Sequence, residues 1–242
     1  MDSAIPPSDS SRAPVKVIIE TVISPFHCLY LDALSLHTKS QEEVERSIAQ
    51  SSRYARAALL AYVGAAEALV HQAAVELARP ELAAIAADPL RPMPLAEVWR
   101  VLPALLAEKP LPVGPNHQDQ PPWPQFAELL ELRNSWAYPG RPSDRLAYYC
   151  STDETNAFVP LQPHQIPAGS PISADRLAFP RTGLPRDPYA LRPAHLDTVR
   201  GVLDAAIEAL DRRVAGKITR DKRLHLEPVR QVHPSLSPAE GV

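Results

Sequence analysis

Apolar residues recur at helical spacing in several stretches of the chain, and these stretches predict its main elements. The longest begins after Ser40 and has an apolar residue on one side at steps of three, four or seven: Val44, Ile48, Ala55, Leu59, Tyr62, Ala66, Leu69 and Ala73. Such a stripe predicts a long helix with one buried face, which ends near Ala78 before Pro80. Ser40 is the expected N-cap, because Glu43 three residues later completes a capping-box pattern.

Shorter helices are predicted downstream. PELAAIAA (80–87) and PLAEVWRVLPALLAE (94–108) each start with a proline, which suits a first helical turn, and Pro103 is a candidate kink in the second. WPQFAELLELRNSWAY (123–138) follows a loop, and its stripe contains Phe126, Leu129, Leu130, Arg133, Trp136 and Ala137. The stripe therefore places one arginine, Arg133, on an otherwise apolar face.

A last amphipathic helix is expected from Pro193, with Gly216 as its C-terminal stop. Its apolar side contains Leu196, Val199, Leu203, Ile207, Leu210 and Val214. Helices whose apolar stripes match in width bury them against one another. The pattern therefore predicts an all-α fold, a four- to five-helix bundle.

The remaining segments predict small extended additions. VKVIIETVI (15–23) is β-branched and indicates a strand, whereas FHCLYLDALSLH (26–37) fits a short helix or a second extended piece. Residues 139–193 form a proline-rich insertion with one hairpin candidate, in which RLAYYC and NAFVPL flank STDET. RLHLEPV (223–229) is a further candidate strand.

These patterns divide the chain into three parts. Residues 1–14 are rich in serine and proline and are expected to be disordered. Residues 15–216 are expected to form a single helical domain that carries the insertion, and residues 217–242 a basic C-terminal tail. A length of 242 residues suits one domain with extensions.

Composition narrows the classes of function. The hydrophobic fraction of 45% and charged fraction of 22% are ordinary for a soluble protein, and a net charge of -3 offers no overall attraction for nucleic acid. No secretory pattern or membrane-spanning apolar run is evident, so we expect a cytoplasmic protein. Its two cysteines, Cys28 and Cys150, have no CxxC spacing, and the eight histidines are scattered, so we predict neither a metal nor another cofactor.

The stretch ELRNSWAYPG (131–140) carries the most distinctive chemistry. The order of the predicted helices resembles the HEPN superfamily of helical-bundle proteins. A long alanine-rich helix comes first, then a helix that ends in ELRN followed by proline and glycine, and an amphipathic helix closes the series. That family carries an arginine followed after four to six residues by a histidine, commonly written RNxxxHP. Arg133 and Asn134 match this motif, and Tyr138 stands where the histidine would be.

The resemblance implies a metal-independent ribonuclease, dimeric, with two motifs facing one another. Arginine would bind phosphate oxygens and histidine would exchange a proton near neutral pH. A tyrosine has an ordinary pKa near 10 and is a poor general base there. We therefore expect a degenerate HEPN-like homodimer, an RNA-binding or protein-interaction module in a stress, toxin–antitoxin or defence context.

Two residues of the long helix are additional candidates. Glu67 lies beside its apolar stripe, where HEPN-like chains often carry a polar residue facing the motif, and His71 lies one turn further on. The alternative function is a metal-independent endoribonuclease in which Arg133 works with Tyr138 or His71. A third possibility is a purely structural bundle in which Arg133 and Asn134 only terminate a helix.

Overall fold

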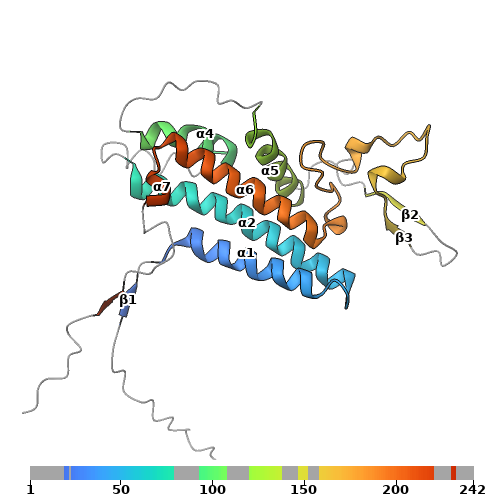
Figure 1. Ribbon diagram of the computed structural model, residues 1–242, viewed down its shortest axis with the longest axis horizontal. Helices are drawn as coiled ribbons and strands as arrows, with labels where there is room; N and C mark the ends of the chain where they lie inside the picture. Colours follow the sequence, from blue (N-terminus) through green and yellow to red (C-terminus); the bar gives the residue numbers. More distant parts are fainter. Residues whose placement is uncertain are drawn as a thin grey trace, which may run out of the picture.

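The computed structural model describes residues 19–21, 23–78, 93–107, 120–137, 147–151, 158–220 and 230–232. The fold is all-α, as the sequence predicts, with small β additions (Figure 1). Its long helices are α1 (Pro25–Glu42), α2 (Ile48–Leu77), α4 (Leu95–Leu106), α5 (Trp123–Ala137) and α6 (Pro193–Arg213), and α7 (Lys217–Arg220) adds one turn. The disorder expected for residues 1–14, the helix 80–87 and the strand 223–229 lie outside the described residues.

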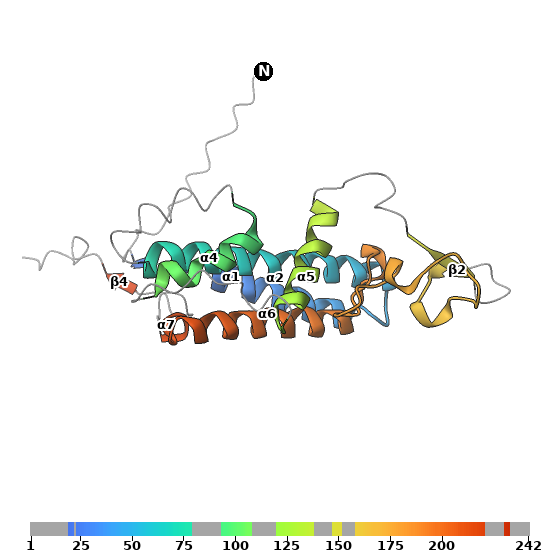
Figure 2. The ribbon, with the colours of Figure 1, turned by 90° about the horizontal axis from the view of Figure 1, so that it is seen from above.

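Helix α2 is the centre of the bundle and contacts each of the other long helices. Figure 2 shows α1, α2 and α6 running alongside one another, with α5 crossing α2 and α6 at a steep angle. The core is built of fully buried side chains that come mainly from α2, α4, α5 and α6, among them Leu59, Tyr62, Leu69, Trp99, Leu102, Leu129, Leu132, Leu196 and Leu203. Each long helix that the structure describes therefore buries its apolar side on α2 or beside it.

Helix α2 is also the one helix of the described residues that is long and apolar enough to cross a membrane. More than half of its most apolar stretch is buried by the surrounding helices. A central core helix needs apolar residues on several sides because neighbours cover it. The position of α2 therefore accounts for its composition.

The predicted start of the long helix was wrong. Helix α1 begins after Ser24 and runs through Ser40, and Ser47 is the N-cap of α2, its hydroxyl accepting from the Gln50 N–H at 3.2 Å. The hydroxyl of Ser40 instead donates to the Ser51 carbonyl at 2.8 Å, and the Ser51 hydroxyl donates back to the Ser40 carbonyl at 2.7 Å. The serine that resembled a cap therefore joins α1 to α2 in the core.

The stripes predicted for the helices near 123–138 and 193–216 are confirmed at the positions whose burial the structure describes. The side chains of Phe126, Leu129 and Leu130 in α5 are buried. In α6 the apolar side is buried, with Ile207 partly so. The α6 helix ends as expected: Gly216 has a positive φ of 77° and its N–H donates to the Asp211 carbonyl at 2.9 Å.

The first residues of the segment predicted as a tail belong to the bundle. Ile218 of α7 is fully buried, and the Lys217 ammonium donates to the Leu106 carbonyl at 2.9 Å. The Asp211 carboxylate accepts from the N–H groups of Ile218 and Thr219. These contacts hold α7 against the ends of α4 and α6.

Two antiparallel strand pairs complete the described structure. The predicted hairpin is confirmed as β2 (Tyr149–Ser151) and β3 (Phe158–Pro160), and it projects from one end of the bundle in Figure 1. Strand β1 (Ile19–Thr21) falls within the predicted strand 15–23 and pairs with β4 (Arg230–Val232). Between the hairpin and α6 the chain is irregular, with short 3-10 turns at 163–165, 174–176 and 188–190, the last labelled η4 below.

Candidate functional site

Arg133 and Glu67, which are far apart in the sequence, meet where α5 crosses α2. The Arg133 Nη2 atom lies 3.7 Å from the Glu67 Oε2 atom. The Arg133 side chain is only 16% exposed, whereas that of Glu67 is about half exposed. The apolar stripe of α5 turns Arg133 towards α2, so a cation that would otherwise extend into solvent is held at the edge of the core.

The ion pair leaves part of the guanidinium without a partner. The Arg133 Nε atom and the Trp136 Nε1 atom are buried and have no hydrogen-bond acceptor among the described residues. Both are N–H donors, and they lie one turn apart on α5. A buried donor without an acceptor costs about 1–3 kcal/mol, so these two N–H groups are locally unfavourable at this corner of the bundle.

The other candidates are less closely associated with Arg133. Asn134 is exposed to solvent. His71 is half-buried one turn beyond Glu67, and within the described residues no hydrogen bond or ion pair joins the two. Tyr138 lies outside the described residues. The structure thus brings together Arg133 and Glu67 and leaves the remaining candidates apart or undescribed.

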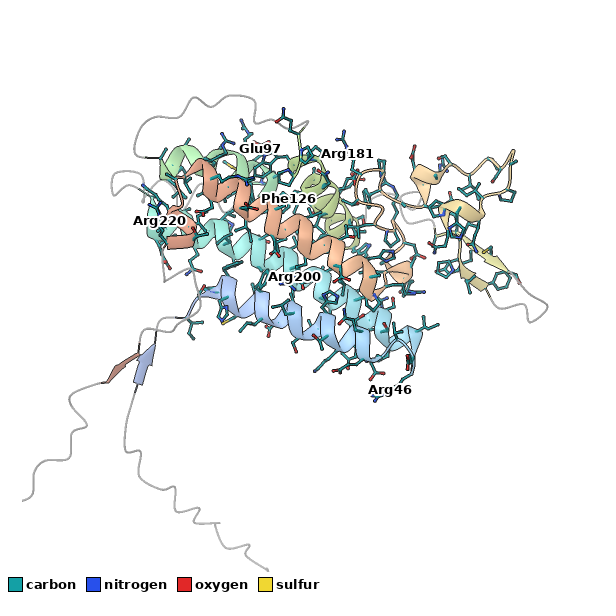
Figure 3. All side chains as sticks on the ribbon, in the orientation of Figure 1. Arg46, Glu97, Phe126, Arg181, Arg200 and Arg220 are labelled. Atoms are coloured by element: carbon teal, nitrogen blue, oxygen red, sulfur yellow. The ribbon has the colours of Figure 1, made fainter. Side chains whose placement is uncertain are left out.

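A buried carboxylate that the sequence analysis missed fixes the chain beside this site. Glu128 of α5 accepts the N–H groups of Arg181 and Thr182, at 3.1 and 2.9 Å, and the Thr182 hydroxyl at 2.9 Å. Arg181 is marked beside α5 in Figure 3. Three residues further along α5, the Glu131 carboxylate accepts from Arg186 at 2.9 Å. Helix α5 therefore anchors the segment that leads to α6.

A second polar cluster lies among α1, α2 and α6. The Tyr30 hydroxyl donates to Asp204 Oδ1 at 2.6 Å, and Arg200, marked in Figure 3, lies 3.5 Å from the other Asp204 oxygen. Burial and the Asp204 carboxylate raise the pKa of Tyr30 to about 12, and burial likewise raises that of Tyr62 to about 12. Both hydroxyls therefore remain protonated near neutral pH and serve as structural hydrogen-bond groups.

A small pocket lies between the hairpin and the start of α6, with a volume of about 40 Å³. His195 lines it, and burial, followed by the Arg192 charge, lowers the pKa of His195. The Arg192 backbone N–H donates to the His195 Nδ1 atom at 3.0 Å, which requires that nitrogen to be unprotonated. Ligand pockets are typically about 300–1,000 Å³, so this one has room for a few water molecules only.

No group of three or more histidine, cysteine, aspartate or glutamate side chains that could hold a metal occurs within the described ranges. Comparison with known proteins adds no relative: no family model, curated protein or solved structure matches the chain. The class of protein that the fold defines is an all-α helical bundle.

Proposed function

We propose that this chain is a degenerate HEPN-like bundle that binds RNA without cleaving it. One observation carries the proposal: Arg133 is held at the edge of the core, 3.7 Å from Glu67, with 16% of its side chain exposed. A solvent-exposed arginine at a helix end would bind a phosphate only weakly, because water competes for it. A partly buried guanidinium presents a pre-oriented fork to a phosphate oxygen.

Tyr138 at the position of the motif histidine supports binding over cleavage. Metal-independent cleavage needs a group that takes a proton from the RNA 2′-hydroxyl near neutral pH, and an ordinary tyrosine does not do this. The resemblance to HEPN proteins also implies a homodimer and a role in stress, toxin–antitoxin or defence responses, and the cysteine usage favours a cytoplasmic location. These belong to the same proposal.

The test is RNA binding and cleavage measured together in EDTA. A fluorescent single-stranded RNA would be titrated with the parent chain and with Arg133→Gln, Glu67→Gln and Tyr138→His. We expect the parent to bind without cutting, and Arg133→Gln to weaken binding. Glu67→Gln should tighten it, because the carboxylate no longer competes with phosphate for the guanidinium.

A purely structural ion pair would behave differently. In that case Arg133→Gln and Glu67→Gln would lower stability alike, and RNA affinity would stay unchanged. Arg212→Gln is the matched control, since Arg212 forms an exposed ion pair with Glu208 at the far end of α6. Absence of RNA binding by the parent contradicts the proposal. Cleavage that Arg133→Gln abolishes would establish the alternative, a metal-independent endoribonuclease.

A further inference from the structure

Exposed aromatic side chains gather at the end of the bundle that carries the hairpin. Among the described residues, Tyr149, Phe158 and Tyr189 are the aromatic side chains that are largely exposed, at 45%, 73% and 62%. Tyr149 pairs with Pro160 and Phe158 with Ser151, so Tyr149 and Phe158 lie on the same face of the hairpin. Exposed aromatic groups in one region are a common feature of binding surfaces.

Tyr189 of η4 connects this hairpin face to the bundle. The small pocket is lined by Tyr148 and Pro160 of the hairpin and by Asp187 and Ala190 on either side of Tyr189, so the hairpin lies next to η4. The Tyr189 carbonyl accepts from the Ser52 hydroxyl of α2 at 3.2 Å. The aromatic surface therefore has a fixed position relative to the start of α2.

Two arginines lie against Tyr189. The Arg56 guanidinium stacks 4.7 Å from the centre of the Tyr189 ring and donates to the Ser52 hydroxyl at 2.8 Å. Arg192 donates to the Tyr189 and Leu191 carbonyls at 2.8 and 3.0 Å. Each arginine is thus held by neutral groups, and within the described part of the chain neither forms an ion pair with a carboxylate.

The two guanidinium groups contact the same residue, Arg56 at the Tyr189 ring and Arg192 at the Tyr189 carbonyl. Burial lowers the pKa of Arg192, Asp187 raises it and Arg56 lowers it again. The Arg192 guanidinium stays charged at neutral pH, because arginine is protonated under all ordinary conditions. The Asp187 carboxylate offsets part of the repulsion between the two guanidinium groups, and a phosphate bound between them would accept charge-assisted hydrogen bonds from both.

This surface and the Arg133 site share one side of α2. Arg56 and Glu67 are separated by three turns of that helix, which corresponds to about 16 Å along its axis and ~20° around it. Leu60, which lies between them on the same side, is 46% exposed. The distance of about 16 Å equals roughly five stacked nucleotides at ~3.4 Å each.

We infer that a single RNA strand lies along this side of α2, with phosphates bound by Arg133 at one end and by Arg56 and Arg192 at the other, and with bases stacked on Tyr189 and Tyr149. The inference rests on the proposed RNA binding and identifies its substrate as single-stranded. Bases in a duplex are already stacked on one another, so only an unpaired base can stack on an exposed tyrosine ring. A surface that interleaves arginine and aromatic side chains is typical of such sites.

The test is fluorescence anisotropy with a labelled twelve-nucleotide oligouridylate. Stacking on an aromatic ring contributes about 1–3 kcal/mol per base, so Tyr189→Ala should raise the Kd about tenfold. Tyr189→Trp should preserve the affinity because it keeps a stacking surface. Arg56→Gln should also weaken binding and reduce the slope of log affinity against log salt by about 0.7, the value for one phosphate contact on a single strand.

Matched measurements separate this inference from the proposed function. Arg212→Gln controls for a change of net charge, circular dichroism checks the fold of each variant, and an RNA duplex should compete at least tenfold more weakly than the single strand. If Arg133→Gln weakens binding while Tyr189→Ala and Arg56→Gln do not, the RNA proposal stands and this inference is overturned. Equal competition by the duplex also overturns it, and a parent chain that binds no RNA overturns both.

Discussion

Replacement of Glu128 should destabilise the protein more than replacement of any exposed glutamate on the same helix. The Glu128 side chain is almost completely buried, and its carboxylate accepts two backbone N–H groups and one hydroxyl from Arg181 and Thr182. Hydrogen bonds to a charged group contribute about 1.5–3 kcal/mol each. The full sum is not lost in Glu128→Ala, because Arg181 is exposed and water reaches its N–H once the carboxylate is gone.

We therefore expect Glu128→Ala to lower the free energy of unfolding by about 2 kcal/mol and Glu128→Gln by about 1 kcal/mol. Glutamine retains one acceptor oxygen but turns an NH2 group towards an N–H donor. For a chain of this length, 2 kcal/mol corresponds to a decrease in Tm of about 4–8 °C. Urea denaturation followed by circular dichroism measures the free energy, and a thermal scan gives the Tm.

Glu131→Gln is the matched control for this prediction. Glu131 lies one turn further along α5 and its ion pair with Arg186 is largely exposed, so its removal should cost less than about 0.5 kcal/mol. The double variant Glu128→Ala with Thr182→Val should lose less free energy of unfolding than the two single variants lose together, because the two side chains share a hydrogen bond. If Glu128→Ala costs no more than Glu131→Gln, the anchoring role assigned to Glu128 is wrong.

Three further predictions concern the end of the bundle and its tyrosines. Gly216→Ala should lower the free energy of unfolding by about 1 kcal/mol, because the residue has a φ of 77° and a Cβ would lie 3.3 Å from the Arg220 side chain. Urea denaturation measures this, and an unchanged midpoint would contradict it. Asp211→Ala should lower the free energy of unfolding by about 2 kcal/mol, because α7 loses the carboxylate that accepts three of its hydrogen-bond donors. The α7 N–H groups should also become less protected from hydrogen exchange. Burial raises the pKa values of Tyr30 and Tyr62 to about 12, above the ordinary value of 10, so the folded chain holds these protons more tightly. The stability that these two groups contribute should be complete below pH 10 and decline between pH 10 and 12. Tyr30→Phe should make that decline shallower, and an identical slope would refute the assignment.

Local periodicity was sufficient to predict the helices that bury one clear stripe. In α6 every predicted apolar position is at least partly buried, and in α5 the same pattern placed Arg133 on the inner side. The N-terminal boundary of α2 was not predicted correctly, because a capping box is a local pattern and Ser40 satisfies its hydroxyl through Ser51 on another helix. Residues 26–37, which belong to α1, could not be assigned to a helix or a strand from the sequence, because their apolar residues do not form one clear stripe.

The candidate site was predictable only in part. Helix periodicity together with the family resemblance was enough to predict that Arg133 and Glu67 face one another. His71 shows no corresponding contact within the described residues. Glu128 resembled an ordinary helix glutamate, because its partners Arg181 and Thr182 come from a distant irregular segment. The contact of Arg56 with Tyr189 likewise joins segments that no local pattern relates.

The position of α2 also has a consequence for the order in which the protein assembles. Helices α1 and α2 are joined by residues 43–47 alone, whereas residues 78–192 separate α2 from α6. Contacts between neighbouring segments close small loops and form early, while distant ones form late. Substitution at the buried Ser51 should therefore slow folding, and Leu203→Ala in α6 should mainly accelerate unfolding. The lifetime of the native bundle is then set by how firmly α6 stays docked on α2.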